Sequence, residues 1–191
     1  MHDTHDQIED NGLKARIIKE TGVNISECYQ CAKCTAGCPM NEYMDIMPSQ
    51  ILRMLQLELP GYEDRILKSY SIWLCLSCET CYTRCPQEVY FSKVMNFLRK
   101  ESIMLSKVNP KAKDILKFHE SFLSSIESTG KLNEMNLLSV YKLKSLNLFQ
   151  DLDLVPSMLM KRKIKLLPHK IKDMDKIKRI FNNTKVKGGK E

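Results

Sequence analysis

The residues best suited to chemistry are eight cysteines, which fall into two runs of one pattern, C-x2-C-x2-C-x3-C-P. The second run begins 47 residues after the first, and together the runs use every cysteine of the chain. A repeated pattern of this kind predicts a pair of matched sites. The two runs comprise Cys28, Cys31, Cys34 and Cys38, then Cys75, Cys78, Cys81 and Cys85.

This spacing is typical of 4Fe–4S ligation in bacterial ferredoxins, in which the fourth cysteine of a run serves the other cluster. Three cysteines at i, i+3 and i+6 can direct their sulfurs to three corners of one cube. The fourth follows a longer step, and the next residue, Pro39 or Pro86, turns the chain away. We therefore predict two 4Fe–4S clusters, cluster 1 on Cys28, Cys31, Cys34 and Cys85, and cluster 2 on Cys75, Cys78, Cys81 and Cys38.

Zinc and disulfides are the alternatives. Structural zinc takes four ligands, commonly from two well-separated CxxC pairs. The third cysteine and the proline-terminated fourth, both repeated, argue against that arrangement. The segment Met1–Asp10 is acidic and has no apolar core, unlike a signal peptide. No run reaches the roughly 18 apolar residues of a spanning helix. We therefore expect a cytoplasmic protein, where disulfides are disfavoured.

Several neighbours of the cysteines have two interpretations. Lys33 and Arg84 could offset cluster charge, or could simply point to solvent. Trp73 could shield a cluster, or belong to the core of a helix face. Gly37 would let the backbone approach a cluster closely.

The sequence contains none of the common catalytic motifs: GxGxxG, the P-loop, HExxH and GxSxG are all missing. We therefore expect a chain that passes electrons without a catalytic site of its own. The bond chemistry would then take place on a partner.

The elements that position the cysteines are expected to be helical. Aromatic residues make up 7% of the chain and there are 7 glycines, fewer than a large β architecture needs. Val23–Ile25 is expected to be extended. Apolar periodicity, proline and glycine predict an all-α fold with helices over 13–21, 48–57, 64–74, 89–106, 111–129, 135–145 and 170–182.

The chain divides into three expected segments. Residues 1–12 are expected to be disordered, 13–106 form a ferredoxin domain that carries both cysteine runs, and 107–191 form a helical extension. The extension either docks on another subunit, which we favour, or forms a core of its own. From Lys161 to Glu191 there are twelve Lys or Arg against three Asp or Glu, so the excess of the +7 net charge lies there. This basic tail is a solvated face, a docking site for an acidic partner or, least favoured, a nucleic-acid contact.

The chain resembles the iron–sulfur subunit, lettered C in its family, of the soluble heterodisulfide reductases of methanogenic archaea. The resemblance covers roughly residues 13–105 and rests on CYQCAKCTAGCP, on WLCLSCETCYTRCP, on the helical spacer between them and on VYFSKVMNFLRK. The cysteine runs alone also resemble the iron–sulfur relay subunits of glycolate oxidase-like and succinate dehydrogenase-like enzymes, which are the alternative.

The resemblance implies an α-helical ferredoxin in a cytoplasmic oxidoreductase complex of methanogenesis. It implies a relay of electrons from a flavin-bearing subunit, which also holds iron–sulfur clusters, to a cysteine-rich catalytic subunit. The catalytic subunit would reduce the CoM-S-S-CoB heterodisulfide, and a hydrogenase or formate dehydrogenase would feed the flavin-bearing one. Neither nucleic acid nor a membrane is expected as a partner.

Overall fold

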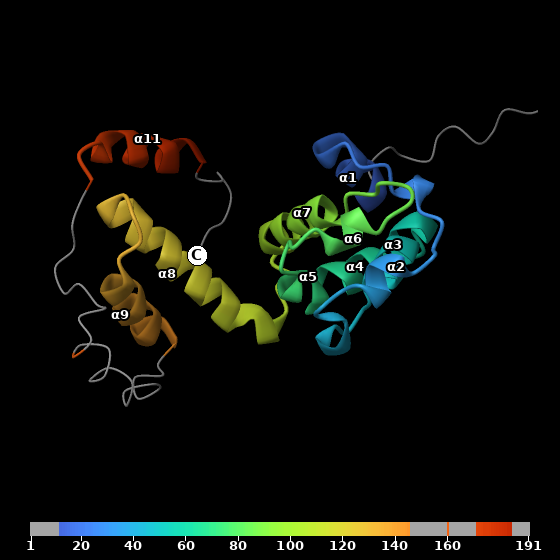
Figure 1. Ribbon diagram of the computed structural model, residues 1–191, viewed down its shortest axis with the longest axis horizontal. Helices are drawn as coiled ribbons and strands as arrows, with labels where there is room; N and C mark the ends of the chain where they lie inside the picture. The colour runs from blue at the N-terminus through green and yellow to red at the C-terminus, as the bar shows by residue number, and fades with distance from the viewer. Residues whose placement is uncertain (1–11, 146–159, 161–170, 185–191) are drawn as a thin grey trace, which may run out of the picture. The chain divides into compact units, whose positions relative to one another are not determined.

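The computed structural model describes residues 12–145, 160 and 171–184, and within these ranges it contains helices and no strand (Figure 1). The prediction of an all-α fold is therefore confirmed. The chain divides into two compact units, Met1–Lys111 and Ala112–Glu191. The expected disordered segment, residues 1–12, lies outside the described residues except for Gly12.

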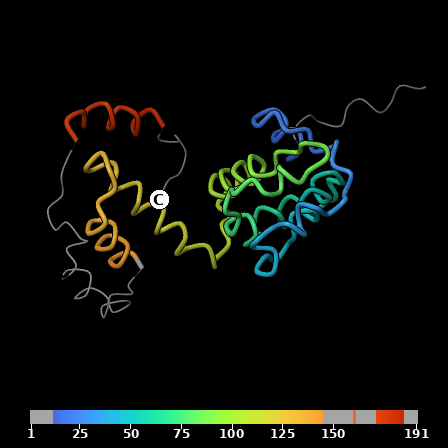
Figure 2. The backbone as a smooth tube through the Cα atoms, in the orientation of Figure 1, coloured from blue at the N-terminus to red at the C-terminus, as the bar shows by residue number. Residues whose placement is uncertain are grey.

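The first unit consists of short helices joined by tight loops (Figure 2), and it contains both cysteine runs. The helices predicted over 13–21 and 48–57 are present, and the one predicted over 89–106 is slightly shorter. In chain order the elements are α1 (Leu13–Thr21), η1 (Ile25–Glu27), α2 (Lys33–Ala36), η2 (Asn41–Tyr43), α3 (Pro48–Leu57), α4 (Tyr62–Leu67), α5 (Ser71–Leu74), α6 (Thr80–Thr83) and α7 (Phe91–Met104).

This unit is a structural duplication. A helix, a short turn of helix, a cysteine run and a second helix occur in that order twice, as α1–η1–α2–α3 and as α4–α5–α6–α7. Equivalent residues are 47 apart up to the fourth cysteine of each run. Beyond it they are 43 apart, because Pro39–Met47 has four residues more than Pro86–Tyr90.

The equivalent helices α3 and α7 supply equivalent core residues. Ile51 and Val94 are both fully buried, and so, to within 2%, are Leu55 and Leu98. Burying a side chain of this size stabilises the fold by about 1.5–3 kcal/mol. The apolar faces of α3 and α7 thus anchor the helices against which the cysteine runs fold.

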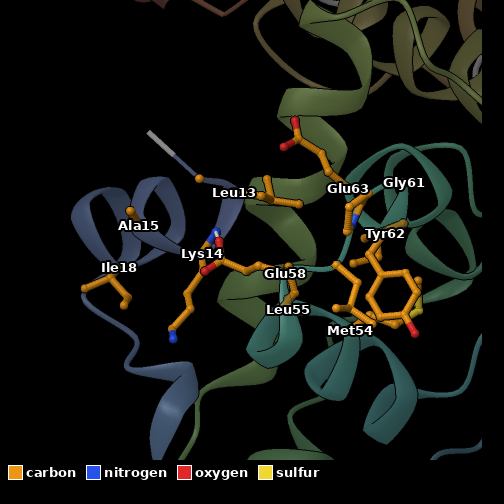
Figure 3. Close-up of a pocket in the computed structure, with 14 residues that line it drawn as sticks. Leu13, Lys14, Ala15, Ile18, Met54, Leu55, Glu58, Gly61, Tyr62 and Glu63 are labelled. Atoms are coloured by element: carbon orange, nitrogen blue, oxygen red, sulfur yellow. Dashed lines mark hydrogen bonds between the residues drawn. The ribbon is translucent and has the colours of Figure 1, made fainter. Parts of the chain in front are cut away.

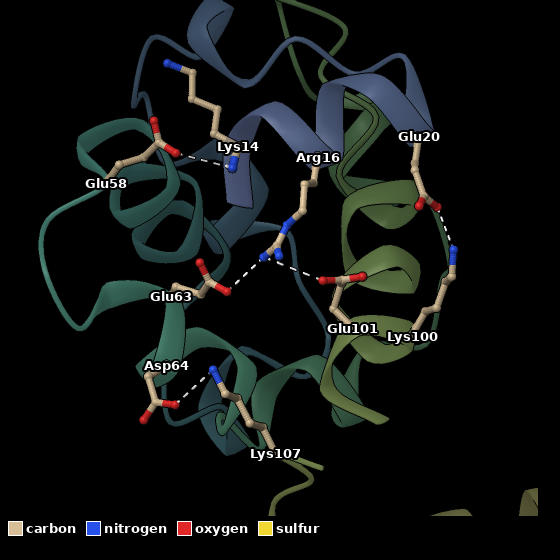
Figure 4. A network of polar contacts seen from close by, with 9 residues as sticks. All are labelled: Lys14, Arg16, Glu20, Glu58, Glu63, Asp64, Lys100, Glu101 and Lys107. Carbon is tan, nitrogen blue, oxygen red and sulfur yellow. Dashed lines mark hydrogen bonds and ion pairs between the residues drawn. The ribbon is translucent and has the colours of Figure 1, made fainter. Parts of the chain in front are cut away.

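A polar network joins α1 to α4 and α7 on the surface of this core (Figure 4). The Arg16 guanidinium lies 2.8 Å from the Glu63 carboxylate and 3.5 Å from that of Glu101, which is buried. Lys100 and Glu20 form a more exposed pair at 2.7 Å. Arg16 therefore links three helices that come from both halves of the duplication.

The prediction of one helix over 64–74 is wrong, because the chain breaks between Leu67 and Ser71. The Asp45 carboxylate accepts hydrogen bonds from the Ser69 hydroxyl at 2.7 Å, the Tyr70 amide at 3.0 Å, the Ser71 amide at 2.9 Å and the Ser71 hydroxyl at 2.6 Å. These donors offset the loss of helical hydrogen bonds at the break. Ile25, expected in an extended segment, instead begins η1.

The second unit contains α8 (Lys113–Thr129), α9 (Glu134–Ser145) and α11 (Met174–Thr184), and η3 (Pro110–Ala112) precedes α8. Helices α8 and α9 pack together, and the buried Ser125 hydroxyl on α8 accepts from the amide of Asn133, which directly precedes α9, at 3.0 Å. The helices predicted over 111–129 and 135–145 are thus present, and α11 overlaps the one predicted over 170–182. Most of residues 146–170 and the end of the basic tail lie outside the described residues.

The docking role of the extension and the border between 106 and 107 stay predictions. Among the helices of the described residues, none is both long and apolar enough to cross a membrane.

Candidate metal centre

The eight cysteines gather around two neighbouring hollows in the first unit. Each hollow has about 400 Å³ of space between the protein atoms, a volume that includes open solvent. Cys81 borders both hollows. The other cysteines lining the Cys28 hollow are Cys28, Cys31, Cys34 and Cys85, and those lining the Cys75 hollow are Cys38, Cys75 and Cys78.

The fourth cysteine of each run therefore lies with the first three of the other run. Cys38 borders the Cys75 hollow and Cys85 borders the Cys28 hollow. This is the placement that the crossed ligand assignment requires, although ligation itself stays a prediction. The structure brings all eight predicted site residues into the two hollows.

The two cysteine loops share an unusual backbone conformation. Gln30 and Ala32 flank Cys31 with φ of 60° and 58°, and the equivalent Ser77 and Glu79 flank Cys78 with φ of 52° and 60°. A left-handed conformation costs a residue other than glycine about 1–3 kcal/mol and persists where the surroundings impose it. Such turns direct successive backbone amides to one side, an arrangement that binds anions, iron–sulfur clusters included. Both loops therefore have the backbone of an anion cradle.

The third cysteine of each run lies on a four-residue helix, Cys34 on α2 and Cys81 on α6. The Thr35 hydroxyl fixes α2 against α3, since it donates to the Ser49 hydroxyl at 2.8 Å and accepts from the Ser49 amide at 2.9 Å. Helices α2 and α6 also contact each other, and this contact brings the two runs together.

Equivalent side chains hold the entrances of the two loops. The Gln56 amide nitrogen donates to the carbonyls of Ile25 at 3.1 Å and Cys28 at 3.0 Å. The Arg99 guanidinium donates to the carbonyls of Ile72 at 2.5 Å and Cys75. We call these contacts the Gln56 clamp and the Arg99 clamp.

Sequence reasoning missed both clamps. The signal that could have found them is the duplication, because Ile25 and Cys28 are equivalent to Ile72 and Cys75 at an offset of 47. Gln56 and Arg99 are then equivalent at an offset of 43 along the following helices.

The thiols are crowded and partly buried. Burial raises the pKa of Cys28, Cys34 and Cys38, and burial together with the neighbouring Cys75 raises the pKa of Cys81 to about 11. A hydrogen bond with the Thr80 hydroxyl instead lowers the pKa of the exposed Cys78. Bound metal would favour the thiolate form of all these groups, and thiolates suit zinc, copper(I) and iron–sulfur clusters. Two adjacent cysteine-lined hollows with anion-binding loops fit iron–sulfur clusters.

The neighbours of the cysteines lie in different environments. Lys33 is exposed and borders the Cys28 hollow, whereas Trp73 is 6% exposed and belongs to the core. Arg84 is exposed and lies against Gly37. Gly37 is thus approached by a side chain of the other run.

A groove elsewhere in this unit has no cysteine in its lining (Figure 3). It lies between α1, the end of α3 and the start of α4, with Leu13 and Ile18 on one side and Met54, Leu55 and Tyr62 on the other. None of its residues belongs to the two cysteine runs, so it is separate from the candidate metal centre.

Known proteins that resemble this chain match the segment that contains the two cysteine runs. Residues 27–90, which include both runs, match the family of 4Fe-4S dicluster domains, so this segment resembles proteins that bind iron–sulfur clusters. The chain is 39% identical over 71 residues to the iron-sulfur subunit, lettered C, of the CoB–CoM heterodisulfide reductase of Methanopyrus kandleri. It is 38% identical over 76 residues to the corresponding iron-sulfur subunit from Methanocaldococcus jannaschii. The resemblance to this iron–sulfur subunit is therefore confirmed.

A longer match is weaker. The chain is 28% identical over 109 residues to the subunit of the same letter in the H(2):CoB-CoM heterodisulfide,ferredoxin reductase of Methanothermobacter thermautotrophicus. These matches span 37%, 40% and 57% of this chain, and 35%, 39% and 57% of the respective relatives.

Proposed function

We propose that this chain is the electron-relay subunit of a heterodisulfide reductase and holds two 4Fe–4S clusters. Cluster 1 is held by Cys28, Cys31, Cys34 and Cys85, and cluster 2 by Cys38, Cys75, Cys78 and Cys81. The observation that carries the proposal is the pair of adjacent cysteine-lined hollows, in which Cys38 lies with the second run and Cys85 with the first. Such clusters supply one-electron transfer, and adjacent centres suit the passage of electrons through the chain.

The chain's own residues bind and tune these centres and leave bond chemistry to a partner. The left-handed residues Gln30, Ala32, Ser77 and Glu79 give both cysteine loops a backbone of the kind that binds anions. The sequence has no motif for flavin, nicotinamide or nucleophilic catalysis. We therefore assign no catalytic site to this chain.

The proposed route runs from a flavin-bearing subunit, fed by a hydrogenase or formate dehydrogenase, to a cysteine-rich catalytic subunit. The catalytic subunit reduces the CoM-S-S-CoB heterodisulfide in the cytoplasm. The support is the name of the relatives, each the same lettered subunit of a heterodisulfide reductase. The helical extension after residue 106 is the proposed docking segment.

Anaerobic purification from a methanogen that expresses the tagged chain tests this proposal. We expect about eight irons per chain, because each of two clusters contains four. We also expect the flavin-bearing and catalytic subunits to co-purify. Two zinc ions per chain would contradict the cluster assignment. A flavin dehydrogenase for a hydroxy acid, in place of these two partners, would contradict the heterodisulfide role alone.

A further inference from the structure

The two cysteine loops are held in the same way by side chains of different charge. Gln56 on α3 and Arg99 on α7 occupy equivalent positions and donate to equivalent pairs of backbone carbonyls. The duplication therefore keeps the clamp geometry in both halves. The two clamps differ in charge, because the Gln56 clamp is neutral and the Arg99 clamp is cationic.

Within the part of the chain that the structure describes, Arg99 forms no ion pair with a carboxylate. Its hydrogen-bond partners are the carbonyls of Ile72 and Cys75 and, at 3.1 Å, the side-chain oxygen of Asn96. Burial lowers the pKa of Arg99, and the neighbouring Cys75 thiolate opposes that shift. A guanidinium remains charged even so.

We propose that Arg99 is a positioning residue that raises the reduction potential of the cluster held by Cys38, Cys75, Cys78 and Cys81. The inference rests on the proposed function, since it requires a cluster in the Cys75 hollow. Reduction adds one negative charge to a cluster, and a fixed cation at the loop entrance stabilises that charge. In the first half, Gln56 holds the equivalent Cys28 loop by hydrogen bonds without a positive charge.

Other charged groups in the loops do not confuse the test. Lys33 lies in the first run, and Glu79 and Arg84 lie in the second. The Glu79 carboxylate accepts a hydrogen bond from the Tyr90 hydroxyl, and the Arg84 side chain lies against Gly37. A substitution at Arg99 leaves all three in place, so the difference between variant and wild type isolates the guanidinium.

The decisive variant is Arg99→Gln, which gives the second half the side chain that the first half uses. The full chain is reconstituted anaerobically, and both potentials are measured by redox titration monitored by electron paramagnetic resonance. We expect the potential of the Cys75-hollow cluster to fall by on the order of 59 mV, a tenfold change in its reduction equilibrium. The other potential should stay unchanged. The signals are assigned with Cys31→Ser and Cys78→Ser, which alter one cluster each.

The reciprocal variant Gln56→Arg keeps the inference testable if Arg99→Gln does not assemble its cluster. It places a guanidinium at the entrance of the Cys28 loop, and we expect the potential of that cluster to rise. Lys100→Gln is the matched control, because it removes one positive charge from the adjacent residue of α7, where Lys100 pairs with Glu20. Both potentials should be unaffected by it.

Two intact clusters with unchanged potentials in Arg99→Gln would overturn the inference, and so would an equal shift of both potentials. Neither result would affect the proposed function. A wild-type chain without two four-iron clusters would contradict the proposed function, and this inference with it.

Discussion

Gly37 and Arg84 occupy the same position in the two cysteine runs, and they lie against each other. Each directly precedes the fourth cysteine of its run. A Cβ atom built on Gly37 would lie 2.6 Å from Cδ of Arg84 and 2.9 Å from its Nε. The first half therefore has a glycine at the point where the long Arg84 side chain of the second half lies. Strict symmetry at this position would bring two large side chains into one space.

This contact predicts a modest cost for Gly37→Ala. The backbone at Gly37 has φ of −97°, which alanine adopts freely, so only the clash with Arg84 matters. Arg84 is exposed and can move, and we expect a loss of about 1 kcal/mol in the free energy of unfolding. Urea unfolding of the reconstituted chain measures it. Arg84→Ala should remove the penalty in the double variant, and a penalty that persists there would show another cause.

Crossed ligation predicts paired effects of cysteine substitutions. Cys38→Ala should damage the same spectroscopic signal that Cys78→Ser alters, because both residues line the Cys75 hollow. Cys85→Ala should damage the signal that Cys31→Ser alters. Electron paramagnetic resonance of the four variants checks this. If Cys38→Ala and Cys31→Ser affected one and the same signal, each run would instead hold its own cluster.

The Arg16 network predicts a larger loss of stability. Arg16→Ala leaves the buried Glu101 carboxylate without its cationic partner, and we expect a cost of about 2–3 kcal/mol. Thermal or urea unfolding of the reconstituted chain measures it. Arg16→Ala combined with Glu101→Gln should recover part of the loss. Lys100→Ala, which breaks the more exposed pair with Glu20, should cost less than about 1 kcal/mol.

Asp45 gives the fold a pH dependence. Burial alone would raise the pKa of Asp45, but hydrogen bonds from Ser71, Tyr70 and Ser69 outweigh it and lower the pKa from 3.8 to about 2. A carboxyl group with a depressed pKa stabilises the fold above its unfolded-state pKa, and that contribution is lost as the pH falls towards 2. Asp45→Ala should therefore cost about 1–2 kcal/mol at pH 7, a low value because solvent screens a carboxylate that is largely exposed.

Unfolding curves of wild type and Asp45→Ala between pH 7 and pH 4 test this expectation. The difference between them should stay constant down to about pH 5 and begin to shrink near pH 4. A difference that grew as the pH fell would contradict the role assigned to the Asp45 carboxylate.

The helices that were predicted correctly are marked by local sequence signals, namely proline, glycine and the spacing of apolar residues. Pro48 and the apolar residues Ile51 and Leu55 mark the helix over 48–57, and Gly130 marks the end of α8, where it adopts φ of 80°. The helix break before Ser71 depends on a carboxylate 26 residues earlier, which no local pattern reveals.

The gathering of the cysteines into two groups was also predictable, because it follows from their spacing along the sequence. The left-handed backbone of the cysteine loops was not predictable. Gln30 and Glu79 are residue types that rarely adopt positive φ, and the surrounding structure imposes it. Gln56 and Arg99 become visible only once the two halves are compared at two different offsets.

The exchange of fourth cysteines has a consequence for the origin of this domain. Under crossed ligation, either half alone supplies three ligands to one hollow and a fourth to a hollow that it lacks. A chain of half the length could complete its ligands only by pairing with a second copy, each lending one cysteine to the other in an isologous dimer. Fusion of two such copies would free the halves to diverge, as Gly37 from Arg84 and Gln56 from Arg99, while neither could be lost.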